Sequence, residues 1–98
     1  RLLRLATLDG ARDLGIADRV GSLEAGKRAD IILVRTTDLN MAPVVDPAFS
    51  LVYSAQPANV DTVIVDGRVL RRHGQWTACD PAQIVRDAAQ SVRELAAR

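Results

Sequence analysis

A β-hairpin is the feature that most limits what this chain can fold into. The dipeptide Asp66-Gly67 stands between two runs with strand composition, Val60–Val65 and Arg68–Arg72. An Asp-Gly pair between such runs is among the strongest signals for a two-residue hairpin turn. A third run, Ile31–Val34, is continuously apolar, which is typical of a strand buried on both faces. The sequence therefore predicts about three strands, with Asp66-Gly67 at the turn of one hairpin.

Short helical patterns precede these strands. The first residues have helical spacing that residues 7–10 interrupt, and Asp9 is placed to cap a second short helix, Gly10 to Leu14. Gly15 is predicted to end that helix in the left-handed conformation, and Gly26 to take positive φ in a type II turn. Helices this short are not stable alone in water, so they need a surface to lie on.

Two further helices are predicted by their start signals. Asp46-Pro47 indicates an N-cap followed by proline at the first helical position, and the helix is expected to end at Gln56-Pro57. Asp80-Pro81-Ala82-Gln83 has the form of a capping box and opens an amphipathic helix that runs to the end of the chain. The fold class expected is α+β.

Composition narrows the class of protein. Aromatic residues make up 3% of the 98 residues, so an apolar core must be built from Leu, Ile, Val and Ala. Cys79 is the single cysteine, which excludes an internal disulfide and suits a cytoplasmic location. With 13 basic and 12 acidic residues, the chain has no electrostatic reason to bind nucleic acid or a membrane. Its apolar runs are far shorter than a membrane span.

An ordered series of motifs resembles a known superfamily. Residues 6–15 fit the pattern A-T-x-x-x-A-x-x-L-G, and residues 21–30 fit G-S-L-E-x-G-K-x-A-D, although Ala25 stands where proline is common. A hydrophobic strand and the hairpin from Val60 to Val69 follow in order. This series resembles the C-terminal signature of the amidohydrolase superfamily. Residues 39–43, 51–55 and 59–63 look most like the branch of triazine chlorohydrolases, guanine deaminases and S-adenosylhomocysteine/methylthioadenosine deaminases.

The resemblance implies a division of the chain. Such enzymes have a (β/α)₈ barrel and a small β-sandwich that is built jointly from the segments before and after the barrel. Residues 1–15 are then expected to be the tail of the last helical region of the barrel, 16–76 the C-terminal portion of the sandwich, and 77–98 a C-terminal helix. The expected partners are an N-terminal segment and barrel of the same protein, within a homo-oligomer. The start at Arg1, without Met, is what we expect of a fragment.

The resemblance also implies metal-dependent chemistry that this chain does not carry. A divalent ion, zinc or iron, lowers the pKa of a bound water so that hydroxide attacks a small-molecule substrate. The family's ligands are a His-x-His pair, two further histidines and an aspartate, all expected upstream of Arg1. His73 is the single histidine. We therefore assign no catalytic, cofactor-binding or metal residue here, and expect the 98 residues alone to be inactive.

Several residues have both a functional and a structural interpretation. His73 is interpreted as a solvated hairpin residue, with a metal contact shared between molecules as the alternative. Cys79 is interpreted as incidental, because a reactive thiol needs a lowered pKa. Lys27 and Asp30 are interpreted as parts of a turn. The arginines at 68, 71 and 72 are interpreted as one solvated face of a hairpin and not as a nucleic-acid site.

Two hypotheses of function follow. The first is a non-catalytic C-terminal segment of a metal-dependent hydrolase that acts on non-peptide C–N bonds, a deaminase or chlorohydrolase of purine, pyrimidine or triazine-like rings. The second is a free-standing, non-catalytic self-association module derived from the same fold. The second hypothesis predicts a monodisperse, cooperatively folded chain that is free of metal. Open strand edges argue against it, because they invite pairing with another chain, so we expect the isolated chain to dimerise, swap elements or aggregate.

Overall fold

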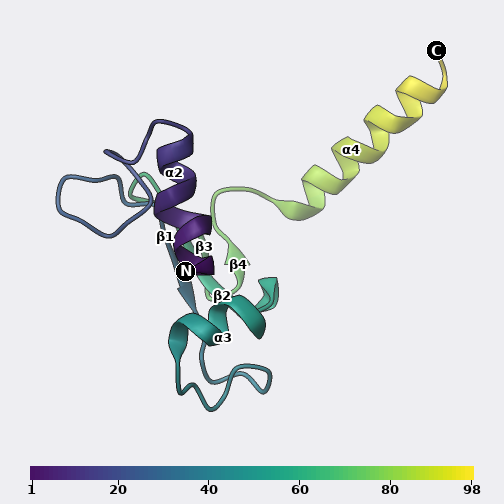
Figure 1. Cartoon of the computed structure of the whole chain (residues 1–98). Helices are drawn as coiled ribbons and strands as arrows, with labels where there is room; N and C mark the ends of the chain where they lie inside the picture. Colours follow the sequence, from purple (N-terminus) through teal and green to yellow (C-terminus); the bar gives the residue numbers. More distant parts are fainter.

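The chain folds around one antiparallel sheet. The computed structural model describes residues 1–98, with β1 (Ile31–Val34), β2 (Val60–Val65), β3 (Arg68–Arg72) and β4 (Gln75–Trp76) paired in the order β1-β2-β3-β4 (Figure 1). Helices flank the sheet, so the predicted α+β class is confirmed. The sheet has four strands where the sequence predicted about three.

The fourth strand depends on a second tight turn. Asp66 and Gly67 have φ of 50° and 78°, as the predicted hairpin requires, and His73 and Gly74 repeat this pair of positive values at 50° and 73°. The second turn brings Gln75 back beside Arg72. Strand β4 was not predicted, because His-Gly is a weaker turn signal than Asp-Gly. His73 therefore lies in a turn, directly after strand β3.

Strand β1 lies at one edge of the sheet and pairs with β2, with Ile31 opposite Ile64 and Val34 opposite Val60. The prediction that this run is buried on both faces is wrong for these 98 residues. Ile32 and Leu33, which point to opposite faces, are 56% and 53% exposed. The rest of the chain therefore leaves more than half of each of these two side chains uncovered.

The N-terminal segment is one continuous helix and not two. It consists of α1 (Leu2–Arg4), the π-helical stretch η1 (Leu5–Asp9) and α2 (Gly10–Asp13). Asp9 has helical φ and makes no capping bond, so its predicted role as an N-cap is wrong. Its carboxylate instead lies 3.3 Å from Nε of Arg4 and 3.5 Å from Nη1 of Arg12. Gly15 ends the helix at φ 73°, as predicted.

The start signals of the other two helices are confirmed. Asp46 accepts a 3.3 Å bond from the Phe49 amide and begins α3 (Pro47–Tyr53), which packs near α1. A short 3₁₀ helix, η2 (Pro57–Asn59), then leads into β2. Asp80 caps α4 (Pro81–Ala96) by accepting from the amides of residues 82 and 83. The reciprocal half of the predicted capping box is absent, because Oε1 of Gln83 accepts from Nη2 of Arg86 at 2.7 Å instead.

The chain encloses very little core. Five residues are buried: Ala11, Met41, Ser50, Asn59 and Thr62. The radius of gyration is 17.3 Å, against about 12.6 Å for a compact domain of this length. Helix α4 contributes to that extension because it stands clear of the sheet (Figure 1). None of the helices combines the length and apolar character that a membrane span requires. Most apolar side chains therefore face outward.

Candidate functional site

The densest set of polar contacts surrounds Asn59. We call Arg35, Asp38, Asn40, Asn59 and Asp61 the Asn59 cluster. The Asn59 side chain is 3% exposed and lies at the junction of η2 and β2. Its Nδ2 donates to Asp38 Oδ2 at 2.8 Å and to Asn40 Oδ1 at 3.0 Å. Its Oδ1 accepts from Asn40 Nδ2 and from the Gln56 amide, both at 2.7 Å. The buried amide therefore has every hydrogen bond it can make.

Arg35 ties this cluster to the sheet. It directly follows β1, and its backbone amide donates to the Asn59 carbonyl at 2.8 Å. Its Nε lies 3.2 Å from Asp38 Oδ2 and its Nη1 lies 3.3 Å from Asp61 Oδ1, while its Nη2 donates to the carbonyl of Ala58. One side chain thus joins the end of β1, the loop after it and the start of β2.

The two carboxylates of the cluster are held ionised. Hydrogen bonding from Asn59, then from Arg35, keeps the pKa of Asp38 below its ordinary value. The Thr62 hydroxyl, which donates at 2.8 Å, is the main cause that lowers the pKa of Asp61, followed by Arg35 and His73. A general acid or base needs a pKa near the working pH. These carboxylates are shifted in the opposite direction, so the cluster is suited to holding a loop in place.

His73 and Cys79 do not form a metal centre. Nδ1 of His73 lies 3.5 Å from Asp61 Oδ2, but the side chain is 80% exposed. Cys79 is exposed and unpaired. A protein zinc site uses three or four nitrogen, sulfur or oxygen ligands. No group of three His, Cys, Asp or Glu side chains in the chain is placed to hold an ion.

Several residues of the motif in the 21–30 segment stabilise a turn. Gly26 has φ 88°, as the predicted turn requires. Lys27, whose side chain is 11% exposed, lies 2.8 Å from Glu24 Oε2 and donates to Ser22 Oγ at 2.6 Å. The Lys27 contact is the main cause that lowers the pKa of Glu24. Asp30 accepts a 2.7 Å bond from the Asp66 amide, which joins this segment to the β2–β3 hairpin.

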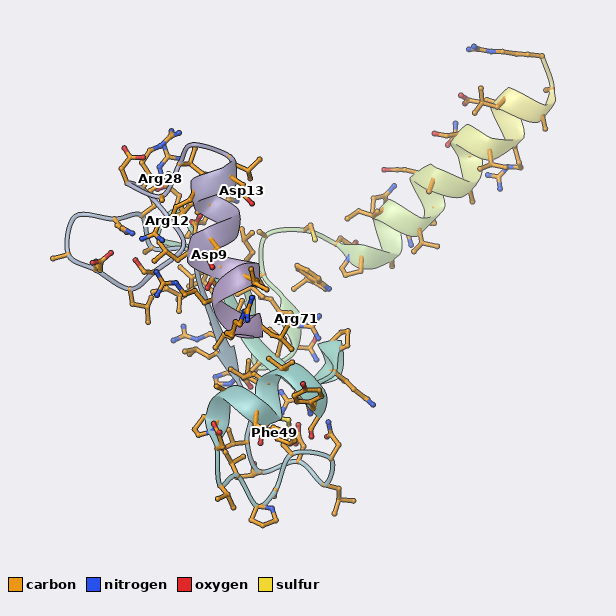
Figure 2. All side chains as sticks on the ribbon, in the orientation of Figure 1. Asp9, Arg12, Asp13, Arg28, Phe49 and Arg71 are labelled. Atoms are coloured by element: carbon orange, nitrogen blue, oxygen red, sulfur yellow. The ribbon has the colours of Figure 1, made fainter.

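The arginines of β3 differ in their surroundings. The Arg71 guanidinium lies 5.2 Å from the ring centroid of Trp76, within the range of a cation–π contact, and Figure 2 labels Arg71 on the sheet. Its Nε has no hydrogen-bond partner. Arg68 and Arg72 are exposed. Arg71 is therefore partly enclosed beside Trp76, whereas Arg68 and Arg72 are surrounded by solvent.

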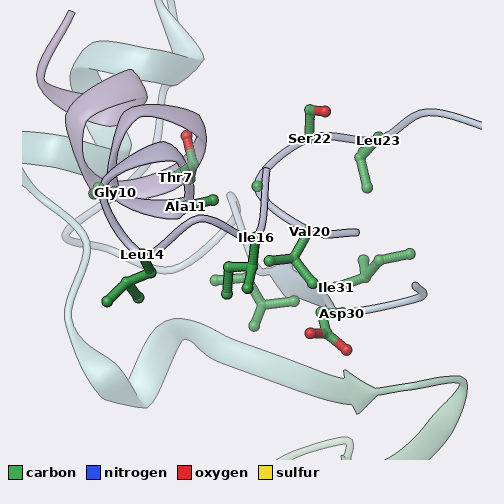
Figure 3. Close-up of a pocket in the computed structure, with 13 residues that line it drawn as sticks. Thr7, Gly10, Ala11, Leu14, Ile16, Val20, Ser22, Leu23, Asp30 and Ile31 are labelled. Carbon is green, nitrogen blue, oxygen red and sulfur yellow. The ribbon is translucent and has the colours of Figure 1, made fainter. Parts of the chain in front are cut away.

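A hollow of about 540 Å³ lies between the N-terminal helix, the loop after it and the start of β1 (Figure 3). Its lining is mainly apolar and includes Ala11, Leu14, Ile16, Val20 and Ile31. The one carboxylate that lines it, Asp30, already accepts from Asp66. The hollow is therefore suited to apolar contact and carries no set of reactive groups.

Comparison with known proteins decides the family. The sequence model of the amidohydrolase family matches residues 1–70. The chain belongs to the amidohydrolase family. The chain is 45% identical over 94 residues to a 5-methylthioadenosine/S-adenosylhomocysteine deaminase of Desulforudis audaxviator, covering 96% of this chain and 22% of that protein. It is also 44% identical over 72 residues to an S-triazine hydrolase of Gordonia rubripertincta, covering 74% and 15%.

Solved structures of amidohydrolase relatives agree with these matches. An adenosine deaminase from Xanthomonas campestris with bound zinc superposes with a TM-score of 0.89 at 34% identity, covering 98% of this chain and 22% of that one. Atrazine chlorohydrolase from Arthrobacter aurescens, complexed with zinc, superposes with 0.81 at 34% identity, covering 91% and 19%. The chain thus spans about a fifth of the length of these relatives.

The zinc of those relatives does not fit the residues of this amidohydrolase chain. Its single histidine and single cysteine have no second nitrogen or sulfur ligand beside them, so we assign no step of metal chemistry to its side chains. The sequence analysis also missed the role of Arg35 and Asp38. Besides contacting each other, they bind Asp61 and Asn59, which lie more than 20 positions away, and no local pattern reveals such pairs.

Proposed function

We propose that this amidohydrolase segment is a non-catalytic part of a metal-dependent hydrolase that acts on non-peptide C–N bonds. The substrate class is a purine, pyrimidine or triazine-like ring, and the reaction is deamination or dechlorination. The relatives named above, deaminases and triazine hydrolases, support this choice. In such chemistry a divalent ion generates hydroxide from bound water. The groups that hold the ion would lie outside these 98 residues.

In this proposal the segment serves as scaffold. Residues 16–76 would form one layer of a small β-sandwich, residues 1–15 the helical tail of a barrel, and residues 77–98 a terminal helix. The observation that carries the proposal is how little the chain buries: apolar side chains on both faces of β1 and along the N-terminal helix are exposed. The expected partner is the remainder of the same polypeptide, in a homo-oligomer. That remainder would cover these surfaces.

A graft tests this proposal. The segment of this chain that matches the D. audaxviator deaminase over 94 residues would replace its counterpart there, and deamination of S-adenosylhomocysteine would be measured with zinc present. The expected result is activity within about tenfold of the parent enzyme, because the site itself is unchanged. Deamination by the isolated 98-residue chain would contradict the proposal. So would a graft that folds, by circular dichroism, and binds zinc but is inactive.

The DNA on the 5′ side of the Arg1 codon gives an independent test. A reading frame that continues upstream and encodes His-x-His, two further histidines and a late aspartate is the expected result. A start codon directly before Arg1 would contradict it and favour the second candidate.

That second candidate is a free-standing self-association module. The open edge of β1 favours it, because an edge strand with exposed apolar side chains pairs readily with another copy. Light scattering of the isolated chain distinguishes the two. A single, well-defined oligomer with cooperative unfolding supports the module, whereas ill-defined aggregation supports a segment that lacks its partner.

A further inference from the structure

The same reactive dipeptide occurs at two places in the chain. Asp9-Gly10 and Asp66-Gly67 are its two Asp-Gly pairs. In such a pair the amide nitrogen of the glycine can attack Cγ of the aspartate, because glycine has no side chain to hinder the approach. The two pairs are chemically equivalent in an unfolded chain. Any difference between their reactivities in the folded chain therefore comes from the structure around them.

The N-terminal helix restrains both reacting groups of the first pair. The Gly10 amide donates to the carbonyl of Leu5 within the helix. The Asp9 carboxylate lies 3.3 Å from Nε of Arg4 and 3.5 Å from Nη1 of Arg12. The nucleophile and the electrophile thus each have other partners. Attack at this pair requires that a helical turn open while two ionic contacts are lost.

The second pair lies in a different environment. Asp66 and Gly67 are both exposed at the turn between β2 and β3, and both have positive φ. The Asp66 amide donates to Oδ1 of Asp30 at 2.7 Å, but the Asp66 carboxylate has no hydrogen-bond or ion-pair partner within the chain. The Gly67 amide donates to the carbonyl of Ala29 at 3.0 Å. The electrophile is therefore free, and one backbone contact holds the nucleophile.

Two hydrogen bonds thus tie the turn to residues 29–30. Exposed turns belong to the parts of a protein that open most easily, without unfolding of the rest. When these two bonds open, the nitrogen of Gly67 is released beside a carboxyl group that nothing else in the chain restrains. The stability of this contact therefore controls how often the pair can react.

We propose that Asp66-Gly67 is a site of isoaspartate formation, and that the contact with residues 29–30 sets its rate. The Gly67 nitrogen forms a bond to Cγ of Asp66 and loses its proton, while the bond from Cγ to the carboxyl hydroxyl breaks and water leaves. Water then opens the cyclic imide at either carbonyl, which gives aspartate or isoaspartate. The only co-reactant is water. This proposal does not depend on the proposed function.

The modification changes the hairpin. In isoaspartate the backbone runs through the former side chain and is longer by one methylene group. A two-residue turn with positive φ at both positions has no room for this extension. The bonds from the turn to Ala29 and Asp30 are then lost, so the hairpin separates from the 21–30 segment. The modified chain also presents the group that an isoaspartyl-specific carboxyl methyltransferase recognises.

The test compares the two pairs within one molecule. The chain is incubated warm at mildly acidic pH, where the neutral carboxyl is the better electrophile, and isoaspartate at each pair is measured by mass spectrometry of its peptides. In the folded chain it should accumulate at least about tenfold faster at residue 66 than at residue 9. In urea the two rates should be similar. The deaminase graft described above repeats the comparison within a whole enzyme.

Variants test the role of the contact. Asp30→Ala removes the acceptor of the Asp66 amide and should raise the rate at residue 66 by about fivefold, the factor that the loss of one ordinary hydrogen bond represents. Asp18→Ala, in the exposed loop after the N-terminal helix, is the matched control and should leave the rate unchanged. Asp66→Glu should abolish modification at the turn, because closure of the larger ring is much slower, and should leave Asp9 unaffected.

Other outcomes would overturn the proposal. Equal rates at the two pairs in the folded chain do so, as does a preference for residue 66 that persists in urea, because the structure then does not choose the site. An effect of Asp30→Ala no larger than that of Asp18→Ala overturns the role of residues 29–30. If Asp30→Ala fails to fold, the comparison between folded chain and urea still decides the site. A graft that isomerises as expected but does not deaminate rejects the proposed function alone.

Discussion

The side-chain amide of Asn59 donates a 2.8 Å hydrogen bond to the carboxylate of Asp38, 21 residues earlier in the chain. The bond joins the loop after β1 to the start of β2. The bond is shielded from solvent, because Asn59 is the least exposed of the five buried residues. These polar contacts therefore help to hold the loop between β1 and α3, which also places Met41 in the small core.

Asn59→Ala should destabilise the chain. The substitution removes hydrogen bonds from Asp38 and Asn40 and leaves the Gln56 amide without a partner, which costs about 1–3 kcal/mol for a buried group. Urea unfolding followed by the fluorescence of Trp76, the single tryptophan, measures this loss. Gln90→Ala, on the exposed side of α4, is the control and should change stability by less than about 0.5 kcal/mol. Equal effects of the two variants would show that the cluster contributes nothing.

Stability should fall in acid. The pKa values of Asp38 and Asp61 are lowered in the folded chain from an ordinary 3.8, so the folded state binds protons less readily than the unfolded state. Their contribution is therefore fully present above that ordinary value and is lost as the pH falls through the lowered ones. Urea midpoints measured from pH 7 to pH 2.5 should stay level and then decline below about pH 4.

Asp38→Asn separates this effect from general acid unfolding. The variant should be less stable at pH 7, because Arg35 loses an ionic partner at 3.2 Å. Its midpoint should also decline less steeply below pH 4 than that of the unchanged chain, because one linked proton is missing. A variant with the same acid slope as the unchanged chain would rule out Asp38 as a source of the pH dependence.

Two glycines with positive φ should respond differently to alanine. At Gly67, with φ 78°, an added Cβ meets no atom within 4 Å, so Gly67→Ala costs only the backbone penalty of about 1–2 kcal/mol. At Gly21, with φ 99°, the added Cβ would lie 2.9 Å from Cβ of Ala11 and 3.0 Å from Cα of Leu8. Gly21→Ala should therefore cost clearly more, as measured by urea unfolding. The reverse order would contradict the close contact between the loop and the N-terminal helix.

The two helix caps should report on different parts of the molecule. Asp46→Ala removes the cap of α3, which packs near α1, and should lower the stability of the folded unit by about 1 kcal/mol. Asp80→Ala removes the cap of the solvated α4 and should reduce helical circular dichroism while leaving the Trp76 unfolding midpoint unchanged. A shift of that midpoint by Asp80→Ala would mean that α4 stabilises the sheet in the isolated chain.

Local signals in the sequence determined most of the elements. The Asp66-Gly67 turn, the caps at Asp46 and Asp80 and the positive φ of Gly15 and Gly26 were all predicted correctly, because each depends on residues within a few positions. The ordered motifs also indicated the family, which the comparisons confirmed. Asp9 was predicted incorrectly as an N-cap. It lies within a continuous helix and forms ion pairs with Arg4 and Arg12, about one turn away on either side.

The tertiary structure alone decided what depends on distant contacts. The Arg35, Asp38 and Asn59 contacts join residues more than 20 positions apart, and β4 exists because a second turn at His73-Gly74 places Gln75 beside Arg72. The exposure of Ile32 and Leu33 was likewise not predictable, because an apolar run in the sequence indicates only that its side chains favour burial. Whether it is buried depends on which surface lies opposite, and these 98 residues cover less than half of either side chain.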